Sequence, residues 1–183
     1  MMREYTLGVN RRVVVDKKNG EFFITIEEPG SDKKSVILPA KRWAALIAYE
    51  SQIDQSVIYL QTNQYVKFST HIGGAYFISI TTGYPCVDLR QFYYNKTKAA
   101  SLPTKHGIAL TLDQWTQLKE INQLIQQHFP KLAKTEICTH TVLSEMMECR
   151  ECHPYQDSMD KTKLPPPPPP PPQQLCSTPL NFY

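Results

Sequence analysis

The feature that most constrains the fold of this chain is an internal repeat, marked by its two tryptophans. Trp43 and Trp115 each lie five residues after a leucine in a short apolar run. After each tryptophan, apolar side chains recur at spacings of three and four residues, which places them on one face of a helix. The sequence therefore predicts two copies of one structural unit, closed by helices at about 38–56 and 111–129.

The residues upstream of each tryptophan also repeat. Leu7-Gly8 and Ile72-Gly73 each precede a run of branched or aromatic residues. Asn19-Gly20 and Thr82-Gly83 are turn signals between neighbouring strands. Each copy is therefore expected to run strand, strand, strand, helix, with room for a short extra strand ahead of the first glycine.

The positive charge of the chain is concentrated in its middle. Residues 67–131 carry seven Lys and Arg against three Asp and Glu, whereas residues 132–183 carry four against six. The basic segment also holds many of the aromatic residues. Basic residues beside aromatics suit a nucleic-acid-binding surface, where they meet phosphates and stack on bases. A solvated basic face has the same composition, so the charge pattern alone leaves both interpretations open.

Several classes of protein are disfavoured by composition and motifs. No stretch approaches the roughly 20 apolar residues of a membrane span, and the first residues lack the apolar block of a signal peptide. We therefore expect a cytosolic or nuclear chain with reduced cysteines and no membrane association. The sequence contains no Walker loop and no dinucleotide fingerprint. We expect no enzyme activity and no cofactor.

Part of the second copy resembles a known family. The runs from Val87 to Tyr93 and from Gly107 to Lys119, joined through Leu102-Pro103, resemble the C-terminal domain of the transcriptional coactivator positive cofactor four. The resemblance covers about residues 70–129, and residues 5–56 resemble the same domain more weakly, in the manner of a tandem duplication. It implies an α+β fold of two fused units, each a curved antiparallel β-sheet followed by one α-helix, that form a pseudo-dimer.

This organisation divides the chain into four expected parts. The first, divergent unit covers 1–57 and the second unit covers 58–133, followed by a Cys/His-containing segment at 134–163 and a disordered proline-rich tail at 164–183. An uncharged stretch, 55–66, joins the two units. A short connection gives the second unit a high effective concentration, so pairing within one chain is expected and the chain should be monomeric.

The resemblance also implies a function. The family's role is non-catalytic binding of single-stranded DNA in transcription, replication or repair, with the transcription or replication machinery as partner. The expected location is the nucleus, or a cytoplasmic site of DNA synthesis for a viral protein. Two alternatives stay open: an RNA-binding protein that uses the same face, and a scaffold whose proline-rich tail recruits partners.

The expected DNA-binding residues lie mainly in the second copy. The family's arginine and aromatic residue on the long strand correspond to Arg90 and Tyr93, and Tyr84 is the candidate in the turn before that strand. The family's basic residues ahead of the last strand correspond to Lys96, Lys98, Lys105 and His106. Exposed aromatic rings stack on unpaired bases, which favours single strands over a duplex whose base faces are hidden.

The first copy departs from this pattern, because Glu27 stands where the second copy has Arg90. Direct contact between the first copy's strand and DNA is therefore in doubt. Phosphate contacts are expected instead from four basic residues, Arg11, Arg12, Lys17 and Lys18. The alternative is that the first copy is only a structural partner.

Two features lie beyond the repeats. Cys138, His140, Cys149 and Cys152 have a spacing that can form a four-ligand zinc site, but the segment is short and has a single Cys-x-x-Cys, so free reduced cysteines and no metal are the favoured prediction. The run Pro165–Pro172 should form polyproline II, which SH3 or WW grooves can bind. A stiff tail without a partner is the simpler interpretation.

Overall fold

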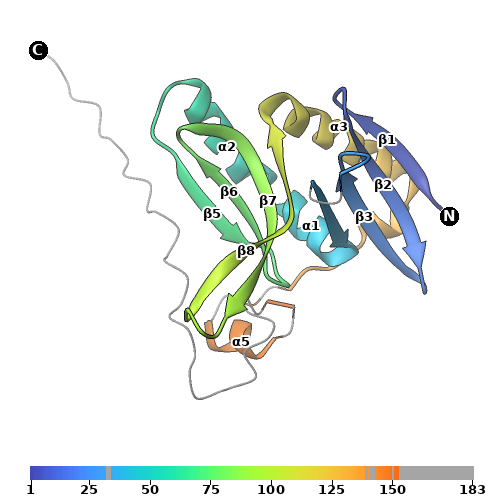
Figure 1. The fold of residues 1–183 in the computed structure, drawn as a ribbon. Coiled ribbons are helices and arrows are strands. Elements are labelled where there is room, and N and C mark those ends of the chain that lie inside the picture. The colour runs from blue at the N-terminus through green and yellow to red at the C-terminus, as the bar shows by residue number, and fades with distance from the viewer. Residues whose placement is uncertain (32–33, 139, 141–142, 150, 153–183) are drawn as a thin grey trace, which may run out of the picture.

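The computed structural model describes residues 1–31, 34–138, 140, 143–149 and 151–152, and it has the predicted α+β fold (Figure 1). Two four-stranded antiparallel sheets are each followed by a helix. The proline run and the tail at 164–183 lie outside the described residues. None of the described helices is long and apolar enough to cross a membrane.

The first unit contains a sheet with the strand order β1-β2-β3-β4 and two helices. Its elements are β1 (Arg3–Leu7), β2 (Arg11–Lys18), β3 (Glu21–Glu27), β4 (Ser35–Pro39), α1 (Ala40–Ala48) and α2 (Glu50–Gln61). The single helix predicted at about 38–56 is therefore two helices that meet at Tyr49. Because α2 continues to Gln61, much of the uncharged stretch expected to be a connection is helical.

The second unit repeats the same order, β5-β6-β7-β8, with longer final strands. Its elements are β5 (Lys67–His71), β6 (Tyr76–Thr81), β7 (Tyr84–Asn95), β8 (Ala100–Thr111), α3 (Leu112–His128), α4 (Pro130–Ala133) and α5 (Leu143–Glu148). Helix α3 lies within one residue of the predicted bounds at each end. Thr111 and Gln114 form a complete capping box at its start, which satisfies backbone N–H groups that would otherwise lack partners.

The two sheets share one hydrophobic core with the helices. Alternate strand residues are buried, including Val13, Ile24, Ile78 and Leu89, as expected for sheets that cover helices with one face and meet solvent with the other. Two helices reach across to the other unit: α3 lies behind the first sheet and α2 behind the second (Figure 1). Helix α1 packs on β3 and β4 of its own sheet, and α3 also contacts β7 and β8. The units are therefore packed through each other's helices.

The two tryptophans occupy equivalent positions in this exchange. The indole Nε1 of Trp43 on α1 donates to Oδ1 of Asn122 on α3, at 3.1 Å. The indole Nε1 of Trp115 on α3 donates to Oδ1 of Asp54 on α2, at 2.7 Å, and Lys119 forms a 2.8 Å ion pair with the same carboxylate. Each tryptophan therefore ties its own helix to a helix of the other unit.

The turns at Gly8 and Gly73 also form hydrogen bonds with helices of the other unit. The Gly8 N–H of the first unit donates to the Gln117 side chain on α3, at 2.8 Å. In the second unit, the Ile72 carbonyl next to Gly73 accepts from Nη1 of Arg42 on α1, at 2.7 Å. The pairing of two units within one chain, predicted from the sequence, thus includes a hydrogen bond from each glycine turn to a helix of the other unit.

We expect the full chain to sediment with the mass of one chain. The reciprocal contacts already bury the faces through which separate copies would pair, and the connection through α2 keeps both units together. Sedimentation velocity across a range of micromolar concentrations measures this mass. A stable two-chain particle would mean that the contacts described here also form between chains.

Candidate nucleic-acid interface

The candidate interface is the solvent-facing side of the second sheet. Since Ile78, Ile80, Val87 and Leu89 point into the core, the alternate positions on β6 and β7 point outward. They border a groove of about 370 Å³, which is lined by Ser79, Thr81, Tyr84, Cys86, Asp88 and Arg90. Tyr84 and Arg90, two predicted DNA-binding residues, therefore lie along one groove.

Hydrogen bonds hold the Arg90 side chain against the sheet. Its Nη2 lies 3.1 Å from Oδ1 of Asp88, and its Nη1 donates to the Thr104 carbonyl at 3.2 Å. Directly opposite on β8 is Gly107, where an added Cβ would come within 2.7 Å of the guanidinium carbon. The absence of a side chain at Gly107 thus provides the space that Arg90 occupies. These hydrogen bonds fix the orientation of the guanidinium, and the Arg90 side chain remains 28% exposed.

Two aromatic rings on β7 are exposed, and one of them, Tyr84, lines this groove. Tyr84 is 63% exposed at the start of β7, and Tyr93 is 44% exposed near its end. The neighbouring Phe92 instead packs edge-on against Phe77, with ring centroids 4.9 Å apart. Phe77 pairs with Arg90 across the strands, so Phe92 lies on the face of Arg90, and Tyr93 projects from the other face of β7. The Tyr93 ring meets solvent there and is accessible for stacking.

The four basic residues predicted ahead of the last strand lie on a β-hairpin. Lys96 and Lys98 are exposed at the turn between β7 and β8, where the Lys98 N–H donates to Asn95 at 2.9 Å. Lys105 and His106 are exposed on β8 itself. The longer stretch of the second copy is therefore an extension of both strands, with a bulge between Arg90 and Phe92. This extension carries the lysines beyond the groove.

The basic residues predicted in the first unit have partners within the protein. Arg12 forms ion pairs with Glu27 at 2.6 Å and with Glu4 at 3.2 Å, and its hydrogen bond to Glu27 raises the pKa of the guanidinium. Arg11 crosses to the second unit, where Nη1 donates to the Ala109 carbonyl at 2.6 Å. The structure thus places Arg11 at the junction between the units.

The turn between β2 and β3 carries the other two predicted residues. Lys17 lies over the ring of Phe22, with Nζ 5.5 Å from its centroid. Lys18 lies 3.7 Å from Asp16. Both lysines are exposed, and they lie in a different sheet from the groove beside Arg90.

The outer faces of the two sheets differ in charge. On the first, the outward positions of β1–β3 hold four carboxylates against two cations: Glu4, Asp16, Glu21 and Glu27 against Arg12 and Lys18. On the second, the cross-strand pairing places Lys67 of β5 beside Thr81, on the same face as Arg90. Lys67 was not among the predicted DNA-binding residues, because the short strand β5 was not predicted in detail. Its position at the end of the uncharged stretch could have indicated a basic residue on this sheet.

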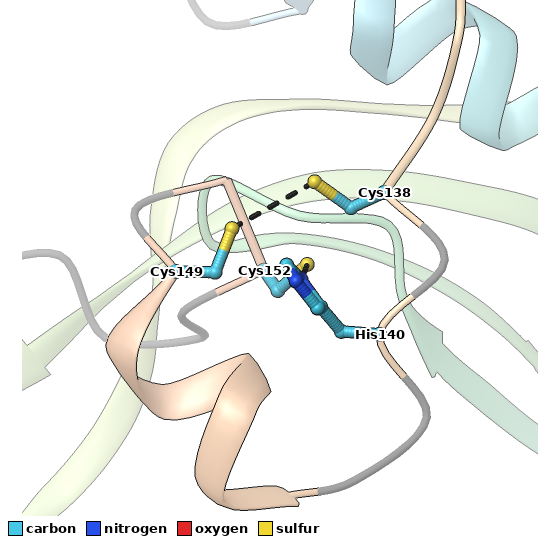
Figure 2. A group of neighbouring side chains, drawn as sticks. All are labelled: Cys138, His140, Cys149 and Cys152. Atoms are coloured by element: carbon cyan, nitrogen blue, oxygen red, sulfur yellow. Dashed lines mark hydrogen bonds between the residues drawn. The ribbon is translucent and has the colours of Figure 1, made fainter.

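The cysteines that the structure describes lie in two places, the groove and the segment after α4. Burial, with a contribution from the Asp88 carboxylate, raises the pKa of Cys86 to about 11, so this thiol in the groove stays protonated near neutral pH. Cys138, His140, Cys149 and Cys152 lie together next to the β5–β6 turn, and the three cysteines are free thiols, as the sequence favoured (Figure 2). This cluster is separate from the residues that line the groove.

Comparison with known proteins finds a family match within the second unit. The family model described as Transcriptional Coactivator p15 (PC4) matches residues 82–121, which span β7, β8 and the first half of α3. No curated protein and no solved structure matches the chain. The matched residues include Arg90, Tyr93, Gly107 and the Thr111 cap. Residues 82–121 are therefore similar to the family described as Transcriptional Coactivator p15 (PC4), which is the family that the sequence resembles.

Proposed function

We propose that this chain binds single-stranded DNA through the outer face of its second sheet and acts in transcription, replication or repair without catalysis. The observation that carries the proposal is the arrangement on β7 within the matched segment. Arg90 lies in a groove over Gly107, and an exposed tyrosine stands in the same groove. A guanidinium binds a phosphate, and an exposed ring stacks on a base.

The charges on this face support an approach by the DNA backbone. Arg90 and Lys67 contribute two positive charges near the groove against the one carboxylate of Asp88. A phosphate that accepts hydrogen bonds from Arg90 would take the place of part of its pairing with Asp88. The exposed lysines of the β7–β8 hairpin then extend the positive surface along the strand. Tyr84 lies in the groove, and Tyr93 is exposed farther along β7 on its other face. Both rings can stack only on unpaired bases, which favours single strands.

Competition binding tests the proposal. A labelled single-stranded DNA is displaced by unlabelled single-stranded DNA, duplex DNA and single-stranded RNA of the same sequence, at about 0.15 M salt. We expect single-stranded DNA to compete best and duplex DNA poorly. Equal competition by the duplex would refute the stacking argument. Stronger competition by RNA would assign the same face to the RNA-binding alternative.

The two units should contribute unequally to binding. Lys105→Ala should weaken binding several-fold, because it removes an exposed charge on the hairpin, and it should reduce the salt dependence by about 0.7 in log–log slope. Lys34→Ala is the matched control, since Lys34 is exposed but forms a 3.0 Å ion pair with Glu28 in the first unit. Fluorescence anisotropy measures both variants. A larger loss from Lys34→Ala would place the main site on the first unit.

A coactivator of this kind would act in the nucleus, with the transcription or replication machinery as its partner. In this proposal the second unit contacts the DNA, and the first unit is its structural partner. Loss of DNA binding in a 1–133 fragment would instead favour a role that depends on the remaining chain.

A further inference from the structure

The four side chains after α4 have the ligand set of a zinc site. Their donor atoms, three thiol sulfurs and one imidazole nitrogen, all lie within 4.8 Å of one another. Figure 2 shows them facing one another, with Cys138 and His140 on the chain before α5 and Cys149 and Cys152 on the chain after it. Thiolate and imidazole together are typical ligands of structural zinc.

Two donor–donor distances in the cluster match those of a tetrahedron around one ion. Zinc–sulfur bonds of about 2.3 Å and zinc–nitrogen bonds of about 2.0 Å put two sulfurs about 3.8 Å apart, and a sulfur and a nitrogen about 3.5 Å apart. The Sγ atoms of Cys138 and Cys149 are 3.7 Å apart. Sγ of Cys152 lies 3.6 Å from Nδ1 of His140. A disulfide would require sulfurs about 2.05 Å apart, so this spacing suits ligands of a shared ion.

The backbone around the Cys-x-x-Cys pair supports this arrangement. The Cys149 N–H donates to the Glu145 carbonyl of α5 at 3.0 Å, and the Cys152 N–H donates to the Cys149 carbonyl at 3.1 Å. The second bond closes a tight turn, which directs both thiols toward the same point. Helix α5 thus ends in a turn that presents two of the four ligands.

The cluster is attached to both units of the fold. Between the two cysteines of the turn, the Glu151 carbonyl accepts from the Gly74 N–H of the second unit at 3.0 Å. The Glu151 carboxylate forms an ion pair with Arg42 on α1 of the first unit. Arg42 is 7% exposed and also donates to the Ile72 carbonyl. The segment that carries the ligands therefore lies across the junction between the units.

Arg42 is a buried cation next to the segment that carries the ligands. Three thiolates and a neutral imidazole around Zn²⁺ carry a net charge of −1, which is costly beside a buried surface unless a cation offsets it. Burial lowers the pKa of Arg42, whereas the charges of the nearby cysteines act to raise it. Arg42, which also pairs with the Glu151 carboxylate, is thus a buried cation beside the segment that carries the ligands.

We propose that Cys138, His140, Cys149 and Cys152 bind one zinc ion, and that this ion fastens the segment after α4 onto the junction of the two units. All four corners of the tetrahedron are filled by the protein, so the site is structural and offers no position for a substrate. The binding of zinc by this cluster is independent of the groove beside Arg90.

Metal content tests the site directly and needs no nucleic acid. The full chain, purified without chelator and dialysed against metal-free buffer, should retain about one zinc per chain by mass spectrometry of the metal. Replacement by Co²⁺ should give the intense visible bands of a tetrahedral thiolate site. Cys149→Ser and His140→Ala should each weaken zinc binding by at least about 100-fold. Cys176→Ser, which changes a cysteine outside the cluster, should retain the full content.

Thermal unfolding tests whether the ion stabilises the attachment of this segment. It also applies to variants that fold poorly. Chelation should lower the Tm of the wild-type chain by at least about 5 °C and should leave the Tm of Cys149→Ser unchanged. A wild-type chain that retains no zinc and gives only the weak bands of hydrated Co²⁺ would overturn the proposal. Equal metal loss from Cys176→Ser, or a Cys138–Cys149 disulfide in the purified chain, would overturn it as well.

Discussion

Raising the salt concentration from about 0.05 M to about 0.2 M should weaken the binding of single-stranded DNA by about 60- to 1000-fold. Each phosphate that the protein neutralises contributes about −0.7 to the slope of log affinity against log salt for single strands. Arg90, Lys67 and the exposed lysines of the β7–β8 hairpin provide four to seven contacts together with the neighbouring basic residues, so we expect a slope of about −3 to −5. Anisotropy titrations at four or five salt concentrations measure it.

Two variants separate the electrostatic part of this binding from stacking. Tyr93→Ala should lower affinity by about 1–3 kcal/mol with little change in the slope, because a stacked ring releases no counterions. Arg90→Gln should lower both the affinity and the magnitude of the slope. A wild-type slope close to zero, or an equal change of slope in both variants, would contradict the arrangement proposed for this face.

Gly73→Ala should destabilise the fold by about 3–5 kcal/mol. Gly73 has a φ of 92°, a region that side chains rarely adopt. An added Cβ would also overlap the guanidinium of Arg42 and crowd the Glu151 carbonyl. Arg42 would have to leave its buried position and lose its bond to Ile72. Unfolding by urea, followed by circular dichroism, measures the change in the free energy of unfolding.

Gly83→Ala is the matched control for this prediction. Gly83 has the same φ of 92°, but an added Cβ there has no neighbour within 4 Å. The backbone conformation alone should therefore cost about 1–2 kcal/mol. The difference between the two variants measures the contact between Arg42 and the second unit. Equal destabilisation would show that the Arg42 contact contributes nothing to stability.

Local signals in the sequence were sufficient for most of the elements. The bounds of α3 follow from Thr111 with Gln114 at one end and Pro130 after the other, because caps and proline act within a few residues. The turns at Asn19-Gly20 and Thr82-Gly83 lie where they were expected, since a positive φ favours asparagine and glycine there. The family resemblance then supplied the antiparallel order of the strands.

Local sequence signals do not predict features that depend on contacts between distant residues. No local signal marked the division of the first unit's helix at Tyr49, where α1 ends and α2 turns toward the other sheet. The partners of Arg11 and Arg12 depend on strand register and on the junction between units. The sequence placed both among the phosphate contacts because it shows their charge and not the residues that face them.

The Cys/His cluster is the clearest case of this limit. Its spacing alone left the choice between zinc and free thiols open, and the shortness of the segment favoured free thiols. The structure adds the contacts of Glu151 with Gly74 and Arg42, which bring the ligand-bearing segment against the body of the protein. These partners lie more than seventy residues upstream in the chain, so a reading of the segment itself does not include them.

The exchange of helices between two covalently joined units has a consequence for how the protein can vary. In a two-fold symmetric homodimer, every substitution appears on both subunits, so a change that suits one face is imposed on the other. Here Trp43 meets an uncharged Asn122 while Trp115 meets the carboxylate of Asp54, and Glu27 occupies the position that Arg90 has in the second sheet. A single chain can therefore keep the mutual support of a dimer while its two faces acquire opposite charge and separate tasks.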